Sequence, residues 1–305
     1  MLTKNSYANH ISLNNPILEL STKNTMEIYT RLLVEVENGE DKDANVPVEE
    51  ILNKIKLNLR KNNKTALVEV DAFKLCLLNQ FDSGSYFNAD GTVKVPKGGV
   101  AQIEVPLCIE GPFSASQYDD FDISLNVNQT VGTNLSIKSV DGVITTVNTD
   151  TDFSDEIIER TANVFKKSFD AISYQEVLKI QSTNAMQEAI VIIRGKNGKR
   201  TDDIIKNIGL RGIGNTKIDL YMVDYLSAKM MNRMNCNNKF QPKGALYINF
   251  CDEITQDVWG IKGWRLLNEK LYFALESLGE GSIEVLTKEL VVNSELIDNA
   301  VFESM

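Results

Sequence analysis

Histidine and basic residues are scarce in this 305-residue sequence. It contains a single histidine, His10, and only 32 lysines and arginines against 42 aspartates and glutamates. One histidine excludes most histidine-based metal sites, as well as Ser-His-Asp triads and Cys-His pairs. The net charge of −10 argues against binding of nucleic acid through the overall field of the protein, which requires clustered lysine and arginine. We therefore predict no catalytic, cofactor-binding or metal-binding residues and no sequence-specific contact with nucleic acid.

Long apolar runs and closely paired cysteines are also missing. No stretch reaches the roughly 18 apolar residues that cross a bilayer, and the first residues lack the basic start and apolar stretch of an export signal. We expect the chain to be made and used without export. The four cysteines, Cys76, Cys108, Cys236 and Cys251, have no C-x-x-C spacing. We interpret them as reduced thiols packed as small apolar groups, rather than as disulfides or metal ligands.

What the sequence does contain is an internal repeat. Residues 17–26 (ILELSTKNTM) return as residues 177–186 (VLKIQSTNAM), and residues 49–79 return later at a constant offset without a gap. The identical pairs include Ile51/Ile204, Leu57/Leu210, Val70/Val223, Asp71/Asp224, Asn79/Asn232 and, in a separate block, Lys97-Gly98/Lys243-Gly244. Matched blocks in the same order, separated by loops of different length, predict two related domains.

Short apolar segments alternate with turn residues in each copy, which is typical of sheets. Residues 32–36 (LLVEV) lead into Asn38-Gly39, and residues 190–193 (IVII) precede Asn197-Gly198. Each copy therefore places a hairpin-type turn at the same point. The period of two in residues 55–59 (IKLNL) is that expected of a half-buried strand.

One segment in each copy interrupts this pattern. Asp71 and Asp224 can each accept backbone N–H bonds at the first turn of a helix, and good helix formers follow both. Asn79 and Asn232 come next, and asparagine tolerates the left-handed conformation that ends a helix. We predict short helices over residues 72–78 and 225–231, with a continuous strand as the alternative.

Two copies of about eight short strands, each with a flanking helix and unequal loops, predict an all-β fold. We expect two tandem eight-stranded jelly-roll β-barrels, a double jelly roll, with short flanking helices. The pattern of residues 203–275, D-I-I-x-x-I-x-L … V-D, helix, N … K-G-A-L-Y-I-N-F … L-Y-F-A-L, and its counterpart in the first copy resemble the double jelly-roll major capsid proteins of the lineage that joins membrane-containing bacteriophages to adenoviruses. The length and the Asn- and Lys-rich composition are similar to the capsid protein of internal-membrane phages infecting flavobacteria.

The resemblance implies a subunit of a virion shell. Three chains would form a homotrimer whose six barrels make a pseudo-hexagonal tile of an icosahedral lattice, over an internal lipid membrane. Minor capsid or penton proteins and membrane proteins would be its partners, and it would pass through the host cytoplasm during assembly. Duplication suits this role, because a fused pair lets three-fold symmetry imitate six-fold symmetry. A two-jelly-roll amidase that removes glycans, and a viral spike or carbohydrate-binding protein, remain alternatives.

The pattern also predicts domain boundaries. We expect an N-terminal arm (1–15), a first jelly roll (16–140), a connector (141–175), a second jelly roll (176–293) and a C-terminal tail (294–305). In the connector, Ser154 is placed to cap an amphipathic helix over residues 154–169, and Phe165 and Phe169 share its apolar face. We interpret that helix as a structural strap.

Several remaining features have structural interpretations. The first copy carries two insertions, residues 40–48 and 82–96, which we expect to be solvated surface loops. Both tryptophans, Trp259 and Trp264, fall in one loop of the second copy, and we expect them to plug a barrel mouth or an intersubunit seam rather than bind sugar.

Two carboxylate groups could suggest a metal site. We interpret Asp119, Asp120 and Asp122 as a solvated strand face, and Asp202-Asp203 as the start of a turn or helix.

Overall fold

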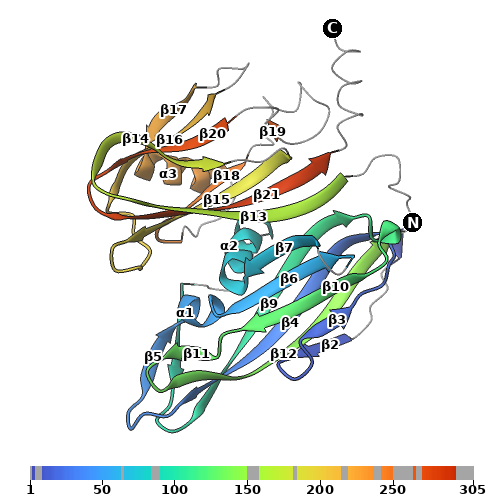
Figure 1. The fold of residues 1–305 in the computed structure, drawn as a ribbon. Coiled ribbons are helices and arrows are strands. Elements are labelled where there is room, and N and C mark those ends of the chain that lie inside the picture. Colours follow the sequence, from blue (N-terminus) through green and yellow to red (C-terminus); the bar gives the residue numbers. More distant parts are fainter. Residues whose placement is uncertain are drawn as a thin grey trace. The chain divides into compact units, whose positions relative to one another are not determined.

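The protein consists of two compact units, Met1–Thr161 (unit 1) and Ala162–Met305 (unit 2). The computed structural model describes residues 2–3, 9–62, 65–83, 90–149, 158–180, 184–213, 219–235, 242–249, 264–265 and 270–292. Figure 1 shows strands throughout the described residues of both units, with few helices. The prediction of an all-β fold is confirmed.

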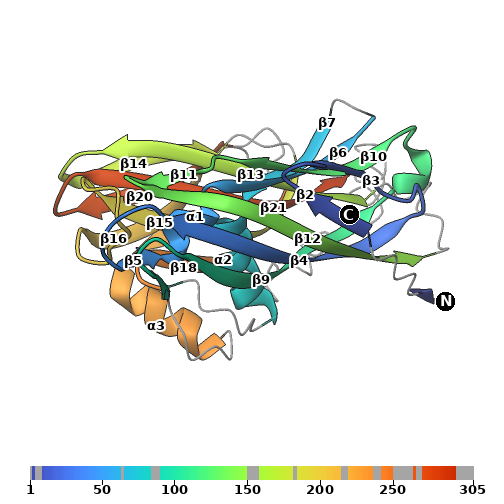
Figure 2. The same cartoon turned by 90° about the horizontal axis from the view of Figure 1, so that it is seen from below.

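Unit 1 is built around two antiparallel sheets and also contains a small two-stranded sheet, β5-β8. One has the order β2-β12-β4-β9, with β1 and β11 also pairing with β12, and the other has the order β7-β6-β10-β3. The strands are β1 (Leu2–Thr3), β2 (Asn9–Ser12), β3 (Ile17–Glu19), β4 (Thr25–Asn38), β5 (Ala44–Pro47), β6 (Ile55–Lys61), β7 (Thr65–Asp71), β8 (Thr92–Val95), β9 (Val100–Phe113), β10 (Phe121–Val127), β11 (Thr130–Gly132) and β12 (Leu135–Thr149). The helices are α1 (Val48–Leu52) and α2 (Ala72–Ser83), with a 3-10 turn at Ala115–Gln117. Figure 2 shows the long strands β4, β9 and β12 running side by side.

Unit 2 has the same construction. One sheet contains β13-β21-β15-β18, with β19 beside β15, and the other contains β14-β20-β16-β17. The strands are β13 (Ile158–Phe169), β14 (Ile172–Ile180), β15 (Ala185–Gly195), β16 (Ile205–Ile213), β17 (Asp219–Asp224), β18 (Ala245–Asn249), β19 (Trp264–Arg265), β20 (Lys270–Ser277) and β21 (Gly281–Val292). A single described helix, α3 (Tyr225–Asn235), follows β17 as α2 follows β7.

The two units share one connectivity. Read in chain order, β2, β4, β9 and β12 correspond to β13, β15, β18 and β21, and both sets are arranged in the same order across their sheets. Likewise β3, β6, β7 and β10 correspond to β14, β16, β17 and β20. The repeat read from the sequence is thus a repeat of topology.

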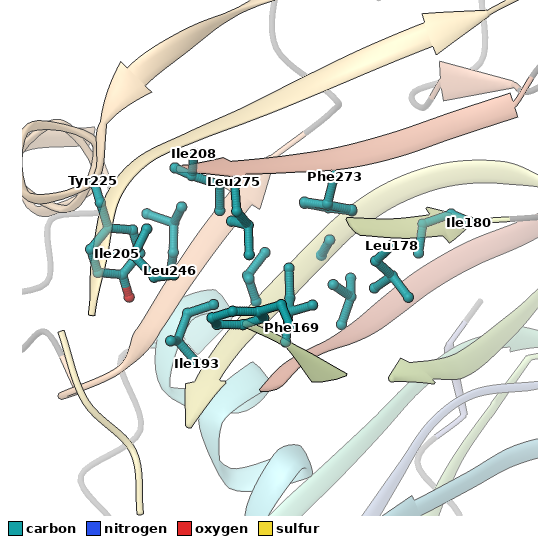
Figure 3. Packing of buried hydrophobic residues seen from close by; sticks show 14 of the residues in the cluster. Phe169, Leu178, Ile180, Ile193, Ile205, Ile208, Tyr225, Leu246, Phe273 and Leu275 are labelled. Atoms are coloured by element: carbon teal, nitrogen blue, oxygen red, sulfur yellow. The ribbon is translucent and has the colours of Figure 1, made fainter. Parts of the chain in front are cut away.

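The core of each unit forms from side chains that alternate along the strands. In β4, Leu32, Val34 and Val36 are fully buried, whereas the alternating residues Arg31 and Glu35 lie on the other face and are at least partly exposed. Figure 3 shows the equivalent cluster of unit 2, to which Phe169, Leu178, Ile193, Phe273 and Leu275 contribute from both sheets. Burying each such large apolar side chain contributes about 1.5–3 kcal/mol. The period of two therefore sets which face of each strand packs inward.

The helix predicted over residues 154–169 is wrong where the structure describes it, because Ile158–Phe169 is the strand β13. Phe165 and Phe169 both pack on the core of unit 2. A spacing of four places two side chains on one face of a helix, but also on one face of a strand. The β-branched residues Ile158, Thr161 and Val164 favour the strand. Ser154, the predicted cap, lies outside the described residues.

The predicted N-terminal arm and the end of the first jelly roll also need correction. Residues 9–12 form β2, which pairs with residues 141–144 of β12, and Ile11 is buried. β12 itself runs to Thr149, well past the predicted boundary at residue 140. Because residues 9–12 are few and mostly polar, they form a strand by pairing with β12 rather than through an alternating apolar pattern of their own. The tail predicted over residues 294–305 lies outside the described residues.

The two insertions of the first copy are not independent loops. Parts of both pair with each other as the two-stranded sheet β5-β8, with Val46 and Val95 buried. The Asn38 side chain donates to the carbonyls of Lys42 (2.9 Å) and Val95 (3.3 Å), tying this sheet to the end of β4. The insertions thus extend one end of unit 1, next to α1 (Figure 1). In the described part of the chain, no helix is long and apolar enough to span a bilayer.

The repeated Lys-Gly pair marks the same turn in both units, since Gly98 has a φ of 57° and Gly244 a φ of 64°. L-residues other than glycine rarely adopt this conformation. A Cβ on Gly98 would meet nothing within 4 Å, whereas one on Gly244 would lie 2.6 Å from the Thr201 nitrogen and 2.7 Å from the Ile193 oxygen.

We predict that Gly98→Ala lowers the free energy of unfolding by about 1–2 kcal/mol, the cost of a left-handed alanine. Gly244→Ala should cost more, because the backbone around Thr201 must also move. Chemical denaturation of both variants checks this order. Equal losses for the two variants would contradict it.

Candidate assembly surfaces

The described residues do not bring together an evident group of reactive or metal-binding side chains. Among them, no group of three or more histidine, cysteine, aspartate or glutamate side chains is placed to hold a metal ion. Asp202 instead accepts hydrogen bonds from Lys229 Nζ (2.7 Å) and from the Gly244 backbone N–H (2.8 Å). Asp203 accepts one from the Thr201 hydroxyl (2.9 Å). The pair Asp202-Asp203 therefore organises a turn, as the sequence predicted.

The other carboxylate group departs from the prediction at one residue. Phe121 and Ile123 point into the core of unit 1 as expected, but Asp122 is only 9% exposed rather than solvated. In the sheet it lies between Arg60 on β6 and Glu19 on β3. Burial raises the pKa of Asp122, and the nearby acidic groups add to that effect against the opposing influence of Arg60.

The two described cysteines, Cys76 and Cys108, are not in a disulfide. Cys76 is buried in α2, and burial raises the pKa of its thiol well above the ordinary range. A thiol held protonated in this way is a poor nucleophile and a poor metal ligand. Cys236 and Cys251 lie outside the described residues.

Of the two tryptophans, the structure describes Trp264. Trp264 begins β19, where it is opposite Met186 of β15. Trp259 lies outside the described residues.

A buried ion pair fixes the start of α2. Asp71 Oδ1 accepts the backbone N–H of Lys74 (3.0 Å), which is the predicted capping bond, and Asp71 Oδ2 pairs with Lys74 Nζ. Both side chains are only 9% exposed. Lys74 therefore has its charge compensated within the fold, which a buried ammonium group requires.

The far end of α2 closes a sheet edge. The helix continues past Asn79, where the sequence predicted its end, and the Asn79 amide both donates to the Cys108 carbonyl (2.9 Å) and accepts the Cys108 N–H (2.8 Å). Cys108 belongs to β9, the end strand of its sheet. Two residues away, Pro106 faces the same side and has no N–H to offer. The outer edge of β9 is thus partly closed to pairing with another strand.

The start of α3 is capped in the same way but in solvent. Asp224 Oδ1 accepts the Ser227 N–H (2.8 Å), and hydrogen bonds from the Ser227 side chain and backbone lower the pKa of Asp224. On the inner side Tyr225 is buried, and Lys229 reaches both Asp202 and the Pro242 carbonyl. α3 also runs past Asn232, the predicted end.

Three apolar side chains at the end of β17 and in α3 are exposed. Val223, Leu226 and Met230 are 38%, 56% and 68% exposed, and we call these three residues the α3 stripe. Sequence reasoning did not single them out, although their alignment with the first copy was visible.

The outer face of the β4-β9 sheet carries polar pairs alongside exposed apolar residues such as Leu33, which is 36% exposed. Arg31 and Glu104 form a two-point ion pair (2.6 and 2.8 Å), and Glu35 accepts bonds from Gln102 and Ser139. Tyr29, 46% exposed, donates to Glu27, and this bond raises the pKa of Tyr29 to about 12. Such cross-strand polar pairs keep their part of the face hydrated and disfavour non-specific association.

Comparison with proteins of known structure identifies the fold. No protein-family model and no curated protein matches the sequence. The structure, however, matches the STIV MCP with a TM-score of 0.77 at 13% identity, covering 97% of both chains. A chain in the atomic structure of Sulfolobus Turreted Icosahedral Virus matches with a TM-score of 0.77 at 11% identity, over 99% of this chain and 96% of that one. The fold is a double jelly roll.

A third match comes from a phage. The major capsid protein P2 of bacteriophage PM2 gives a TM-score of 0.55 at 11% identity, over 95% of this chain and 94% of that one. The agreement with the predicted fold class therefore extends over both units. Identities this low establish the double jelly roll alone.

We predict that the two helix caps differ in their contribution to stability. Asp71→Ala removes the cap and leaves Lys74 buried without its partner, so it should cost about 3–5 kcal/mol. Asp224→Ala removes only an exposed cap and should cost about 1 kcal/mol. Denaturant unfolding of the two variants provides the measurement. A larger loss for Asp224→Ala would show that the buried pair is not essential.

We predict that Asp122→Asn stabilises unit 1 at neutral pH. Because folding raises the pKa of Asp122, the ionised carboxylate carries a penalty that is absent at acid pH, where the side chain is protonated in both states. The gain should be below about 1 kcal/mol, since solvent screens part of it, and should fade as the pH falls. Thermal unfolding across pH checks it, with Asp119→Asn as an exposed control. A loss of stability at pH 7 would refute it.

Proposed function

We propose that this chain is the major capsid protein of an icosahedral virus. One observation carries the proposal: both units, in one chain, match solved capsid proteins over nearly the full length of each partner. The matches bear the names of several viruses, including STIV and PM2. This breadth favours a capsid role over the glycan amidase and the spike or carbohydrate-binding protein, and a shell subunit needs no catalytic residue.

The duplicated topology supports a trimeric building block. Two units of the same connectivity in one chain give six jelly rolls when three chains associate. Such an object is three-fold by symmetry and nearly six-fold in outline. It can therefore fill the hexagonal positions of an icosahedral lattice with a single kind of chain.

The surfaces of unit 1 suit a protein packed at very high local concentration. The end strand β9 is partly closed by Asn79 and Pro106, which lowers the risk of strand-to-strand aggregation. The exposed ladder of Arg31, Glu104 and Glu35 keeps a neighbouring sheet face polar. Contacts between copies are then left to other, more specific surfaces.

We further propose that the shell encloses a lipid membrane and includes minor capsid or penton proteins and membrane proteins. The resemblance to capsid proteins of internal-membrane phages supports this, as does the narrower likeness to phages of flavobacteria. The protein would act in the virion and pass through the host cytoplasm during assembly. Its net charge of −10 suits a shell that makes no sequence-specific contact with the genome.

We predict that the purified protein forms trimers, and that virus particles contain it in greater copy number than any other protein. Light scattering coupled to size exclusion measures the first, and quantitative mass spectrometry of particles the second. A protein that stays monomeric at every concentration, or a minor component of the particle, would contradict the capsid role.

The membrane is tested separately on intact particles. Lipid extraction followed by mass spectrometry should find phospholipid that copurifies with the shell, and a low buoyant density should be lost after extraction. Particles of protein and nucleic acid alone would refute the membrane while leaving the capsid role intact.

A further inference from the structure

The α3 stripe is a contiguous apolar surface. Val223 is the penultimate residue of β17, Leu226 follows three residues later, and Met230 lies one helical turn beyond Leu226. Residues four apart on a helix are neighbours on its surface. The opposite side of the same helix carries Tyr225 and Lys229, which are buried. The stripe is therefore the outward face of α3, and its three side chains are 38%, 56% and 68% exposed.

The same three positions are buried in the first copy. The gap-free repeat aligns Val223 with Val70, Leu226 with Phe73 and Met230 with Leu77. Those counterparts are 1%, 0% and 0% exposed. Three aligned positions are thus apolar in both copies, covered within the chain in one copy and open to solvent in the other.

The composition of the two helices points the same way. In residues 72–79, the part of α2 whose side chains the structure describes, Lys74 and Asn79 bind Asp71 and Cys108, and every side chain is buried. A helix whose surface is apolar on every side is normally buried on every side. α3 keeps apolar residues at the aligned positions although no described residue of the single chain covers them. This is the pattern of a surface that is covered on association.

We infer that the α3 stripe is a contact surface for a second copy of this chain. This rests on the proposed capsid function, and it deepens that function by naming residues at the contact between subunits. In a ring that imitates six-fold symmetry, equivalent positions of the two units have equivalent surroundings. At the aligned positions α2 is buried in the single chain whereas α3 is exposed, so we assign the cover of α3 to a neighbouring chain.

The chemistry of the stripe fits this occupant. Two copies of a chain with a net charge of −10 repel one another, so a contact between them needs an uncharged, desolvated patch. The stripe supplies one, with Asp224 at its border rather than inside it. The carboxylate of Asp224 is exposed, and its negative charge opposes contact with an anionic membrane surface.

The test replaces the stripe by charge. Leu226→Glu combined with Met230→Glu should raise the concentration at which trimers dissociate by at least about a hundred-fold, since each buried apolar side chain contributes a factor of about ten or more. Because both side chains are exposed in the single chain, circular dichroism and thermal unfolding of the monomer should be unchanged. Leu278→Glu is the matched control: Leu278 is also 68% exposed and lies in unit 2 outside the stripe, so its trimers should persist.

A second measurement does not depend on charge. A photoreactive benzoylphenylalanine at position 230 should yield a product of the mass of two chains on a denaturing gel. All peptides of that product should come from this chain. The milder pair Leu226→Ser and Met230→Ser, which leaves the helix uncharged, should weaken the trimer in the same direction.

The outcomes separate the two claims. Wild-type trimers that survive the double glutamate substitution, or a cross-linker that reacts without joining two chains, overturn the contact surface and leave the capsid role standing. A wild type that never associates contradicts both. Loss of binding to anionic phospholipid vesicles, with trimers intact, would assign the stripe to lipid and overturn the inference.

Discussion

The face-to-face packing of two sheets over one apolar core is the constraint on which each unit depends. In unit 2, Leu178 and Phe273 on one sheet meet Ile193 and Val285 on the other, and burial of such residues stabilises the pair of sheets against the entropy of ordering the chain. Every strand must therefore keep its apolar face inward. That requirement explains why the alternating pattern is maintained through both copies while loop lengths diverge between them.

Face-to-face packing does not satisfy the polar groups at the sheet edges and helix ends. The two units satisfy them with related residues. An aspartate at the end of the strand before the helix caps α2 and α3 alike, but Asp71 is buried with Lys74 whereas Asp224 is solvated. Lys229, which aligns with Cys76 rather than with a lysine, holds the turn at Asp202 instead. The duplicated frame has thus been retained, and the polar contacts around each helix have diverged. This divergence is what leaves one helix covered and the other with an apolar outer face.

The sequence predicted the fold class, the repeat and both helices, because these depend on local signals that recur: period-two strands, Asp caps and Lys-Gly turns. It failed where tertiary context decides. Phe165 and Phe169 fit helix and strand equally well, and residues 9–12 become a strand only because β12 offers them a partner. The pairing of β5 with β8 joins two segments that lie far apart in the sequence, and the burial of Asp122 depends on neighbours from two other strands. The sequence showed that the residues of the α3 stripe are apolar, but it could not show that they are exposed.

The central claim is that three copies of this duplicated chain imitate a hexamer. Cryo-electron microscopy of the purified oligomer tests it most directly, without imposed symmetry. The account predicts a three-fold particle in which six jelly-roll densities of similar shape surround the axis, two from each chain. A particle with two-fold symmetry, or a three-fold particle whose two units do not alternate around the axis, would contradict it.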